Sequence, residues 1–284
     1  MAKKKKKKIT KKQRRQLWLG LLATVLGMGV LLVLAMGLPE QPVSLPPETT
    51  AETEGTTAPP VSALPVNPYG PADFQYDGDY LTCISGESRL GVDVSSHQGE
   101  VDWTQVAEAG MEFAMIRLGY RGYGSGVMKV DEYARENLAA AAEAGLDVGV
   151  YFFSQAVSPA EARQEARFVL AVLEEVELQM PVVFDWEYVS GDARTGDMDP
   201  RTLTDCAAAF CEEIKEAGYD VMIYFNQHLA QEFLILEELQ GYDFWLALYD
   251  DEMTWPYRIR MWQYTEEGSV PGISGNVDIN LWLE

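Results

Sequence analysis

The pattern of apolar and polar residues divides the chain into four parts. Residues 1–16 are polar and basic, and residues 17–38 form an unbroken apolar run of 22 residues without a charge. Residues 39–80 are polar and contain nine of the fourteen prolines. From 81 to 284, short apolar runs alternate with amphipathic stretches, a pattern that predicts one globular β/α domain.

Eight apolar runs within 81–284 have the length and composition of buried strands, and five helical patterns lie between the early ones. The strands are expected at 90–96, 113–120, 147–154, 181–187, 221–226, 244–250, 259–265 and 277–283, and the helices at 103–109, 132–144, 159–176, 202–217 and 229–239. Strands that are apolar on both faces and alternate with helices form parallel sheets. Eight of them favour a closed barrel. After the sixth strand the connections are too short for full helices, so we expect an α/β fold, an irregular TIM-like barrel with a strand-rich C-terminal closure.

The pattern of residues 1–38 predicts a membrane anchor. As a helix, 17–38 is about 33 Å long, which spans a bilayer core of roughly 30 Å. The ten Lys and Arg of 1–16 place the N-terminus in the cytoplasm and the globular domain outside the cell membrane. A cleaved signal peptide is the alternative, but its apolar region is usually only about 7–15 residues long. Residues 39–80 are expected to be a disordered linker.

Charge and cysteine content exclude several functions. Without residues 1–16 the chain has 12 Lys and Arg against 44 Asp and Glu, a formal charge of −32, which argues against nucleic-acid binding. Cys83, Cys206 and Cys211 are expected to be buried free thiols, since no Cys/His cluster has the spacing of a metal site. The glycines of 119–126 lack the Lys-Ser/Thr of a phosphate loop. We expect no cofactor, and a mobile loop at 119–126.

Two carboxylates end the fourth predicted strand. Asp185 and Glu187 lie two residues apart, so alternation along the strand points both to the same side. Two acids held this close have divergent pKa values, and one of them stays protonated as a general acid for glycoside hydrolysis. A structural ion pair is the competing interpretation, although basic residues are scarce here.

Two further acids interrupt apolar strands. Asp93 lies in the first strand, where Val92 and Val94 face the opposite side, and Asp278 lies in the last strand. In parallel β/α folds the active site gathers at the carboxyl ends of the strands. We therefore expect all four acids at one barrel mouth, while His97 is weaker evidence because a single His after a strand is more often structural.

Aromatic residues also gather at strand positions, where most of them belong to the core. Those near strand ends are candidates for stacking on sugar rings: Tyr151, Tyr188, Tyr224, Trp262 and Tyr264. Such platforms beside carboxylates suit a neutral polysaccharide.

Four segments together resemble a known family. "GVDVSSHQGEVDW" (91–103), "PVVFDWE" (181–187), "FWLALYD" (244–250) and "MWQYTEEGSVPGISGNVDINLW" (261–282) are similar to glycoside hydrolase family 25, the muramidases of bacteria and phages. The resemblance covers about residues 90–282. It implies an irregular β/α barrel that cleaves the β-1,4 bond between N-acetylmuramic acid and N-acetylglucosamine in peptidoglycan glycan strands.

The resemblance also implies roles for the four acids. Glu187 matches the general acid and Asp185 its partner on the same strand, while Asp93 and Asp278 match the acids of the first strand and of the "NVD" motif. The family mechanism implies retention with help from the substrate's N-acetyl group, which Asp185 would stabilise; inversion stays open. Many members have Tyr-His-Phe where this chain has Phe152 between two aromatic residues, which bears on substrate preference.

Two other functions stay open. "FDWEY" also resembles the chitinases of family 18, but that pattern requires acids at the positions of Met180 and Val183. A catalytically inactive, membrane-anchored peptidoglycan-binding module would need no acid pair, so the complete set of carboxylates argues against it.

Overall fold

The computed structural model describes residues 63–173 and 176–284. Within these residues no helix is both long enough and apolar enough to cross a membrane. The predicted membrane segment 17–38 lies outside them, as does most of the predicted linker.

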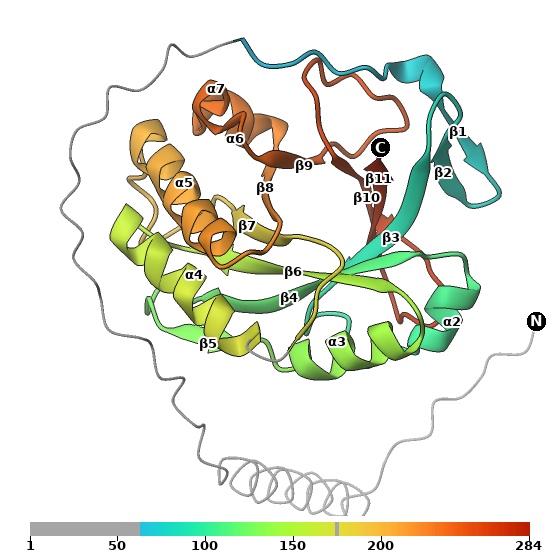
Figure 1. The fold of residues 1–284 in the computed structure, drawn as a ribbon, viewed down its shortest axis with the longest axis horizontal. Coiled ribbons are helices and arrows are strands. Elements are labelled where there is room, and N and C mark those ends of the chain that lie inside the picture. The colour runs from blue at the N-terminus through green and yellow to red at the C-terminus, as the bar shows by residue number, and fades with distance from the viewer. Residues whose placement is uncertain (1–62, 174–175) are drawn as a thin grey trace, which may run out of the picture. The chain divides into compact units, whose positions relative to one another are not determined.

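Eight strands form a closed barrel (Figure 1). They are β3 (Ser88–Val94), β4 (Phe113–Arg121), β6 (Asp147–Ser154), β7 (Val182–Trp186), β8 (Val221–Asn226), β9 (Asp243–Ala247), β10 (Met261–Gly268) and β11 (Val277–Leu283). Neighbouring strands from β3 to β10 are parallel, and β11 is antiparallel to both β10 and β3. All eight predicted strands and the strand-rich closure are confirmed.

Helices connect the parallel strands and cover the outside of the barrel (Figure 1). They are α2 (Trp103–Glu108), α3 (Ala134–Glu143), α4 (Pro159–Leu173), α5 (Pro200–Glu216), α6 (Gln227–Glu232) and α7 (Leu236–Leu239). Asp102 and Asp199 accept backbone N–H groups at the starts of α2 and α5, which satisfies donors that a helix leaves unpaired. The single helix predicted at 229–239 is two short helices, because the backbone at Ile235 is not helical.

The inside of the barrel is packed with large side chains that alternate with those facing the helices. The inner cluster consists of Phe113, Met115, Met180, Val183, Met222, Tyr224, Trp245, Ala247 and Met261. Glycines leave room for them. A Cβ at Gly91 would lie 2.5 Å from the ring of Phe113, and one at Gly149 would lie 2.6 Å from Met180. These side chains fill the middle of the barrel, and a cavity opens at the carboxyl ends of the strands.

A small additional layer precedes the barrel. It consists of a 3-10 turn, η1 (Pro71–Asp73), and the antiparallel hairpin β1 (Phe74–Asp77) and β2 (Tyr80–Cys83). Leu64 and Phe74 are buried, and the Asn67 side chain donates to the carbonyl of Trp255 at 3.0 Å. The ordered domain thus begins before residue 81, because a few apolar side chains in the proline-rich segment pack against the barrel.

The predicted mobile loop 119–126 is part of a hairpin. β5 (Met128–Val130) pairs antiparallel with the end of β4, and the Gly122 N–H donates to the carbonyl of Val127 at 2.9 Å. Gly126 has a positive φ of 69°, which an L side chain rarely adopts. The glycines of this segment thus serve a tight turn.

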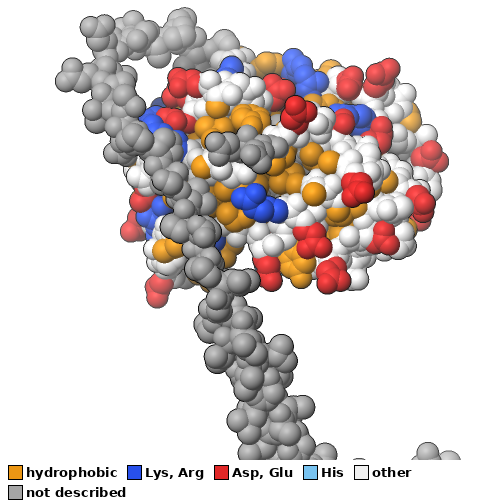
Figure 2. Space-filling model, turned by 60° about the horizontal axis from the view of Figure 1, so that its bottom comes forward, with side chains coloured by type: hydrophobic (Ala, Val, Ile, Leu, Met, Phe, Trp, Pro, Cys, Tyr) orange, Lys and Arg blue, Asp and Glu red, His pale blue; other side chains and the backbone are white. Residues whose placement is uncertain are grey.

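The surface is strongly acidic, in line with the composition. Figure 2 shows one face on which Asp and Glu side chains are spread widely and Lys and Arg occupy few places. Several arginines already pair with carboxylates, such as Arg201 with Asp205 and Glu238. The described cysteines are all free and buried, as predicted.

Candidate active site

A cavity of about 650 Å³ opens at the carboxyl ends of the parallel strands. All four acids singled out in the sequence line it: Asp93 from β3, Asp185 from β7, Glu187 just after β7, and Asp278 from β11. The structure therefore brings together residues that lie up to 185 positions apart in the sequence, as the alternation within each strand predicts.

Asp93 and Asp278 are direct neighbours across the antiparallel pair β3–β11. Their carboxyl groups share a hydrogen bond, so one of them must be protonated. Burial, followed by the negative charge of Asp278, raises the pKa of Asp93 well above its ordinary value. Burial also raises the pKa of Asp278, to about 6. Asp93 therefore keeps the proton, and its O–H donates the shared hydrogen bond to the Asp278 carboxylate.

Amide side chains orient Asp93. Its Oδ2 accepts Gln263 Nε2 and Asn280 Nδ2, both at 2.8 Å. Asn280 Oδ1 in turn accepts the indole N–H of Trp245 at 2.8 Å, and Gln263 Oε1 accepts the hydroxyl of Tyr224 at 3.1 Å. The donors and acceptors of this buried network are thus paired, which fixes the carboxyl group of Asp93 in one orientation.

Asp185 is nearly buried, with 4% of its surface exposed. Its Oδ1 has no hydrogen-bond partner among the described residues. Burial, then the charges of Glu187 and Asp93, raises the pKa of Asp185, while the nearby Arg117 guanidinium opposes the shift. A buried acceptor without a partner is costly, so this oxygen is available to bind a polar group of a ligand in the cavity.

Glu187 follows β7 and is less enclosed than Asp185. Burial, then the charges of Asp278 and Glu266, raises the pKa of Glu187. Glu266 lies after the bulge of β10 and lines the same cavity. The structural ion-pair interpretation fails for Asp185 and Glu187, because neither appears in a salt bridge among the described residues. Both shifts favour the protonated forms, so this pair can hold a proton for a ligand, and the Arg117 guanidinium favours the ionised form of Asp185.

The predicted aromatic platforms divide into two groups. Tyr151 and Tyr224 line the cavity. Trp262 and Tyr264 are buried outside it, since the inward-facing positions on β10 are Met261, in the inner cluster, and Gln263, at the cavity. The ring of Trp262 packs against Phe74 of the additional layer and against Tyr264.

Tyr188 also lies outside the cavity. It is 53% exposed and its ring packs against Phe233, with centroids 6.2 Å apart. Trp186 points to the outer side of β7 against the same Phe233, as the alternation around Asp185 predicts.

Several cavity residues were not singled out in the sequence. Tyr123 of the hairpin and Tyr249 after β9 are exposed aromatics at the cavity, and Gln263 and Arg117 are polar residues on inward positions of their strands. Gln263 was identifiable, because it is a polar residue in an apolar strand just as Asp93 is. Tyr249 has the parity of Trp245 in the predicted strand 244–250, whereas Tyr123, in its loop, had no such signal. His97 lines the cavity as well.

The cavity has no arrangement suited to a metal. Among residues 63–173 and 176–284, no group of three or more His, Cys, Asp or Glu side chains is placed to hold a metal ion. The chemistry available here is that of protonated and ionised carboxyl groups beside aromatic rings.

Comparison with known sequences identifies the family. The model of "Glycosyl hydrolases family 25" matches residues 92–273, which include Asp93, Asp185 and Glu187 and end five residues before Asp278. The protein YegX of Escherichia coli K12 is 27% identical over 205 residues, 68% of each chain. The autolytic lysozyme of Clostridium acetobutylicum is 25% identical over 195 residues, which cover 68% of this chain and 56% of the relative.

Comparison with solved structures agrees with this family assignment. The modular autolysin LytC of Streptococcus pneumoniae, solved in complex with a synthetic peptidoglycan ligand, aligns with a TM-score of 0.60 and 26% identity. The alignment covers 69% of this chain, and the chain spans about half (47%) of the length of LytC. With the matched family model and the barrel in agreement, the chain belongs to the glycosyl hydrolases family 25.

Proposed function

We propose that the protein is a peptidoglycan hydrolase that cleaves the β-1,4 bond between N-acetylmuramic acid and N-acetylglucosamine. The observation that carries this proposal is the convergence of Asp93, Asp185, Glu187 and Asp278 on one cavity at the barrel mouth. Membership of family 25 and the similarity to an autolytic lysozyme support the substrate class.

Glu187 acts as the general acid. Its raised pKa favours the protonated carboxyl group, which can give its proton to the glycosidic oxygen as the C–O bond breaks. The leaving sugar departs with this proton. The resulting Glu187 carboxylate then takes a proton from the water that completes hydrolysis.

Asp185 stabilises the N-acetyl group during this reaction. The acetamido oxygen attacks the anomeric carbon and forms a cyclic oxazolinium ion, whose N–H the unpartnered Oδ1 of Asp185 accepts. Water then attacks the same carbon and reopens the ring. Two successive inversions give net retention of configuration.

Asp93 and Asp278 support the acid rather than react. Asp93 keeps its proton and orients Asp278 through their shared hydrogen bond. The negative charge of Asp278 then raises the pKa of Glu187. The amide groups of Gln263 and Asn280 hold this pair in place.

The experiment that tests this proposal compares hydrolysis with binding. Purified peptidoglycan is incubated with the full-length chain or with Glu187→Gln, and soluble glycan fragments and sedimented protein are measured. Release of fragments by the wild type alone supports the hydrolase. If the wild type binds the wall but releases no fragments, the protein is a binding module. If both proteins release equal amounts of fragments, Glu187 is not the general acid. Chitin oligomers cleaved in place of peptidoglycan would favour a chitinase-like activity.

We also propose that residues 17–38 anchor the enzyme in the cell membrane, with its barrel on the outer side. The apolar length and the basic flank of this segment support the proposal. Such an enzyme would cut wall close to the membrane. Membrane fractionation of the full-length chain tests it, and recovery of a shortened, soluble protein would indicate a cleaved signal peptide instead.

A further inference from the structure

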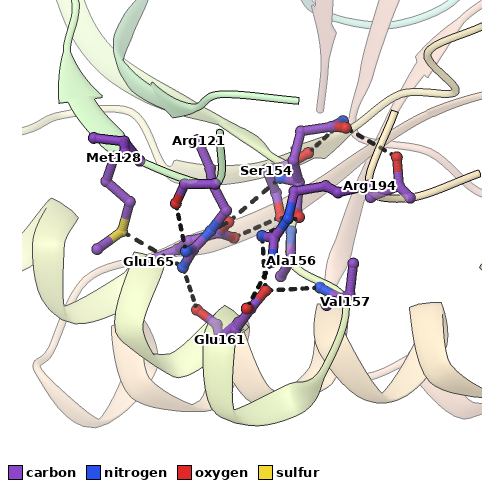
Figure 3. A network of polar contacts seen from close by, with 12 residues as sticks. Arg121, Met128, Ser154, Ala156, Val157, Glu161, Glu165 and Arg194 are labelled. Atoms are coloured by element: carbon purple, nitrogen blue, oxygen red, sulfur yellow. Dashed lines mark hydrogen bonds and ion pairs between the residues drawn. The ribbon is translucent and has the colours of Figure 1, made fainter. Parts of the chain in front are cut away.

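A second polar network joins β4, β6, α4 and the segment that follows β7 (Figure 3), and its Arg121 also lines the cavity. Ser154, Gln155 and Glu165 are fully buried, and Arg121 is 5% exposed. The Arg121 Nε donates to Glu165 Oε1 at 2.6 Å. Burying such an ion pair contributes little net stability compared with apolar residues of similar size. Its presence here therefore calls for a geometric role.

Gln155 is the member of this network that reaches the proposed general acid. Its side-chain Nε2 donates to the backbone carbonyl of Glu187 at 3.3 Å and to that of Ser154 at 2.9 Å. Its Oε1 accepts the hydroxyl of Thr195 at 2.9 Å. The amide therefore contacts the segment 187–195 near both of its ends, and the Thr195 hydroxyl fixes which end of the amide faces Glu187.

The backbone of Gln155 is held as firmly as its side chain. Its N–H donates to Glu165 Oε1 at 3.3 Å, and its carbonyl accepts Arg194 Nη1 at 2.9 Å. Arg194 also forms two hydrogen bonds with the Glu161 carboxylate, at 2.7 and 2.8 Å, as Figure 3 shows. Gln155 is thus anchored on α4 and at the far end of the segment 187–195.

The segment that begins with Glu187 has little structure of its own. It contains no helix or regular strand between the end of β7 and the start of α5. Glu187 has one strand neighbour, Trp186, on one side and an irregular loop on the other. A hydrogen bond at the Glu187 carbonyl is therefore well placed to fix where its carboxyl group points.

We propose that Gln155 is a positioning residue for Glu187. Its side-chain amide binds both ends of the segment 187–195 and thereby holds the backbone of Glu187 in place. This inference rests on the proposed function, because it assigns Gln155 a part in the work of the general acid. Gln155 does not line the cavity and does not contact the substrate. It acts through the backbone of Glu187.

The test uses two variants of the full-length chain, the double variant that combines them, and one matched control. Gln155→Met keeps the length of the side chain and removes both the NH2 and the carbonyl oxygen of the amide, and Thr195→Val removes only the hydroxyl that orients the amide. Asn137→Leu is the control, because Asn137 is an equally buried amide whose Oδ1 accepts Trp103 Nε1 at 3.1 Å between α2 and α3. Release of soluble glycan from peptidoglycan gives kcat and KM, and the thermal midpoint reports stability.

We expect Gln155→Met to lower kcat about 10- to 100-fold with KM changed less than about threefold, since small misplacement of a catalytic group costs rate rather than binding. Thr195→Val lowers kcat by a smaller factor. The double variant is no slower than Gln155→Met alone, because both changes act on the same contact. Asn137→Leu lowers the thermal midpoint but leaves both kinetic constants within about twofold.

Three results would overturn the inference: an unchanged kcat in Gln155→Met, effects of the two substitutions that multiply, or an equal loss of kcat in Asn137→Leu. If Gln155→Met does not fold, Thr195→Val decides, and a wild-type kcat in that variant overturns the inference. A wild type that cleaves no peptidoglycan contradicts the proposed function itself, which distinguishes the two failures.

Discussion

Asp93 on β3 and Asp278 on β11 lie directly opposite each other and share one hydrogen bond between their carboxyl groups. Such a pair holds a proton because the mutual repulsion of two carboxylates at this distance disfavours ionisation of both groups. The proton makes Asp93 a neutral donor inside the barrel and leaves Asp278 as the charged member beside the cavity.

Replacement of Asp93 by Asn is therefore expected to stabilise the protein in alkaline solution. The Asn Nδ2 can donate to Asp278 as the protonated Asp does, and its Oδ1 can accept from Gln263 and Asn280. Because the folded-state pKa of Asp93 is raised, its contribution to stability is present at low pH and is lost as pH rises through that pKa. Thermal midpoints from pH 4 to pH 9 should fall less steeply in the variant. A variant less stable than the wild type at pH 8 would contradict this assignment.

Asp185→Asn is expected to separate activity from stability. The substitution removes a carboxyl group whose ionisation burial disfavours, so the thermal midpoint at pH 8 should be equal to or higher than that of the wild type. It also removes the negative charge proposed to stabilise the oxazolinium ion, so kcat should fall about a hundredfold or more. Peptidoglycan release and thermal unfolding measured on the same preparation check both effects. A variant with wild-type kcat would exclude Asp185 from the mechanism.

The dependence of rate on pH follows from the raised pKa of Glu187. A general acid works only when protonated, so the alkaline limb of the kcat/KM profile should fall as pH rises through the pKa of Glu187. Glu266→Gln removes one of the charges that raise it and should move the alkaline fall to lower pH. Glu232→Gln, an exposed acid on α6, serves as the control and should leave the profile unchanged. An alkaline fall at the same pH in wild type and Glu266→Gln would show that Glu266 does not act on Glu187.

The close packing of the barrel interior can be tested at Gly91. A methyl group added at Gly91 would lie 2.5 Å from the Phe113 ring, so Gly91→Ala should lower the free energy of unfolding by about 1–3 kcal/mol. It should also lower activity, because Gly91 lies two residues before Asp93 on β3. Gly241→Ala is the matched control, since nothing lies within 4 Å of the added methyl group and its φ is not positive. Denaturant unfolding compares the two, and equal stabilities would contradict the close packing.

The sequence predicted the barrel well for a physical reason. Strands buried on both faces read as apolar runs, and acids that interrupt such runs, like Asp93 and Asp185, stand out. The alternation of side chains along β10 distinguishes Gln263, which faces the cavity, from Trp262, which does not. Nearness to the end of the strand does not distinguish them. Tyr123 could not be found this way, because a loop brings it to the cavity and loops have no period, whereas Tyr249 shares the parity of Trp245 and Ala247 in the predicted strand 244–250. The hairpin β1–β2 was hidden by the prolines around it.

The most direct test of the account identifies the sugar at each new reducing end. Peptidoglycan digested by the full-length chain is reduced with borohydride and its fragments are analysed by mass spectrometry, with Glu187→Gln in parallel. The account predicts reduced N-acetylmuramic acid at the new ends in the wild-type digest and none above background with the variant. New ends that consist of N-acetylglucosamine would contradict the proposed cleavage site, and new muramic ends with the variant would contradict Glu187 as the acid.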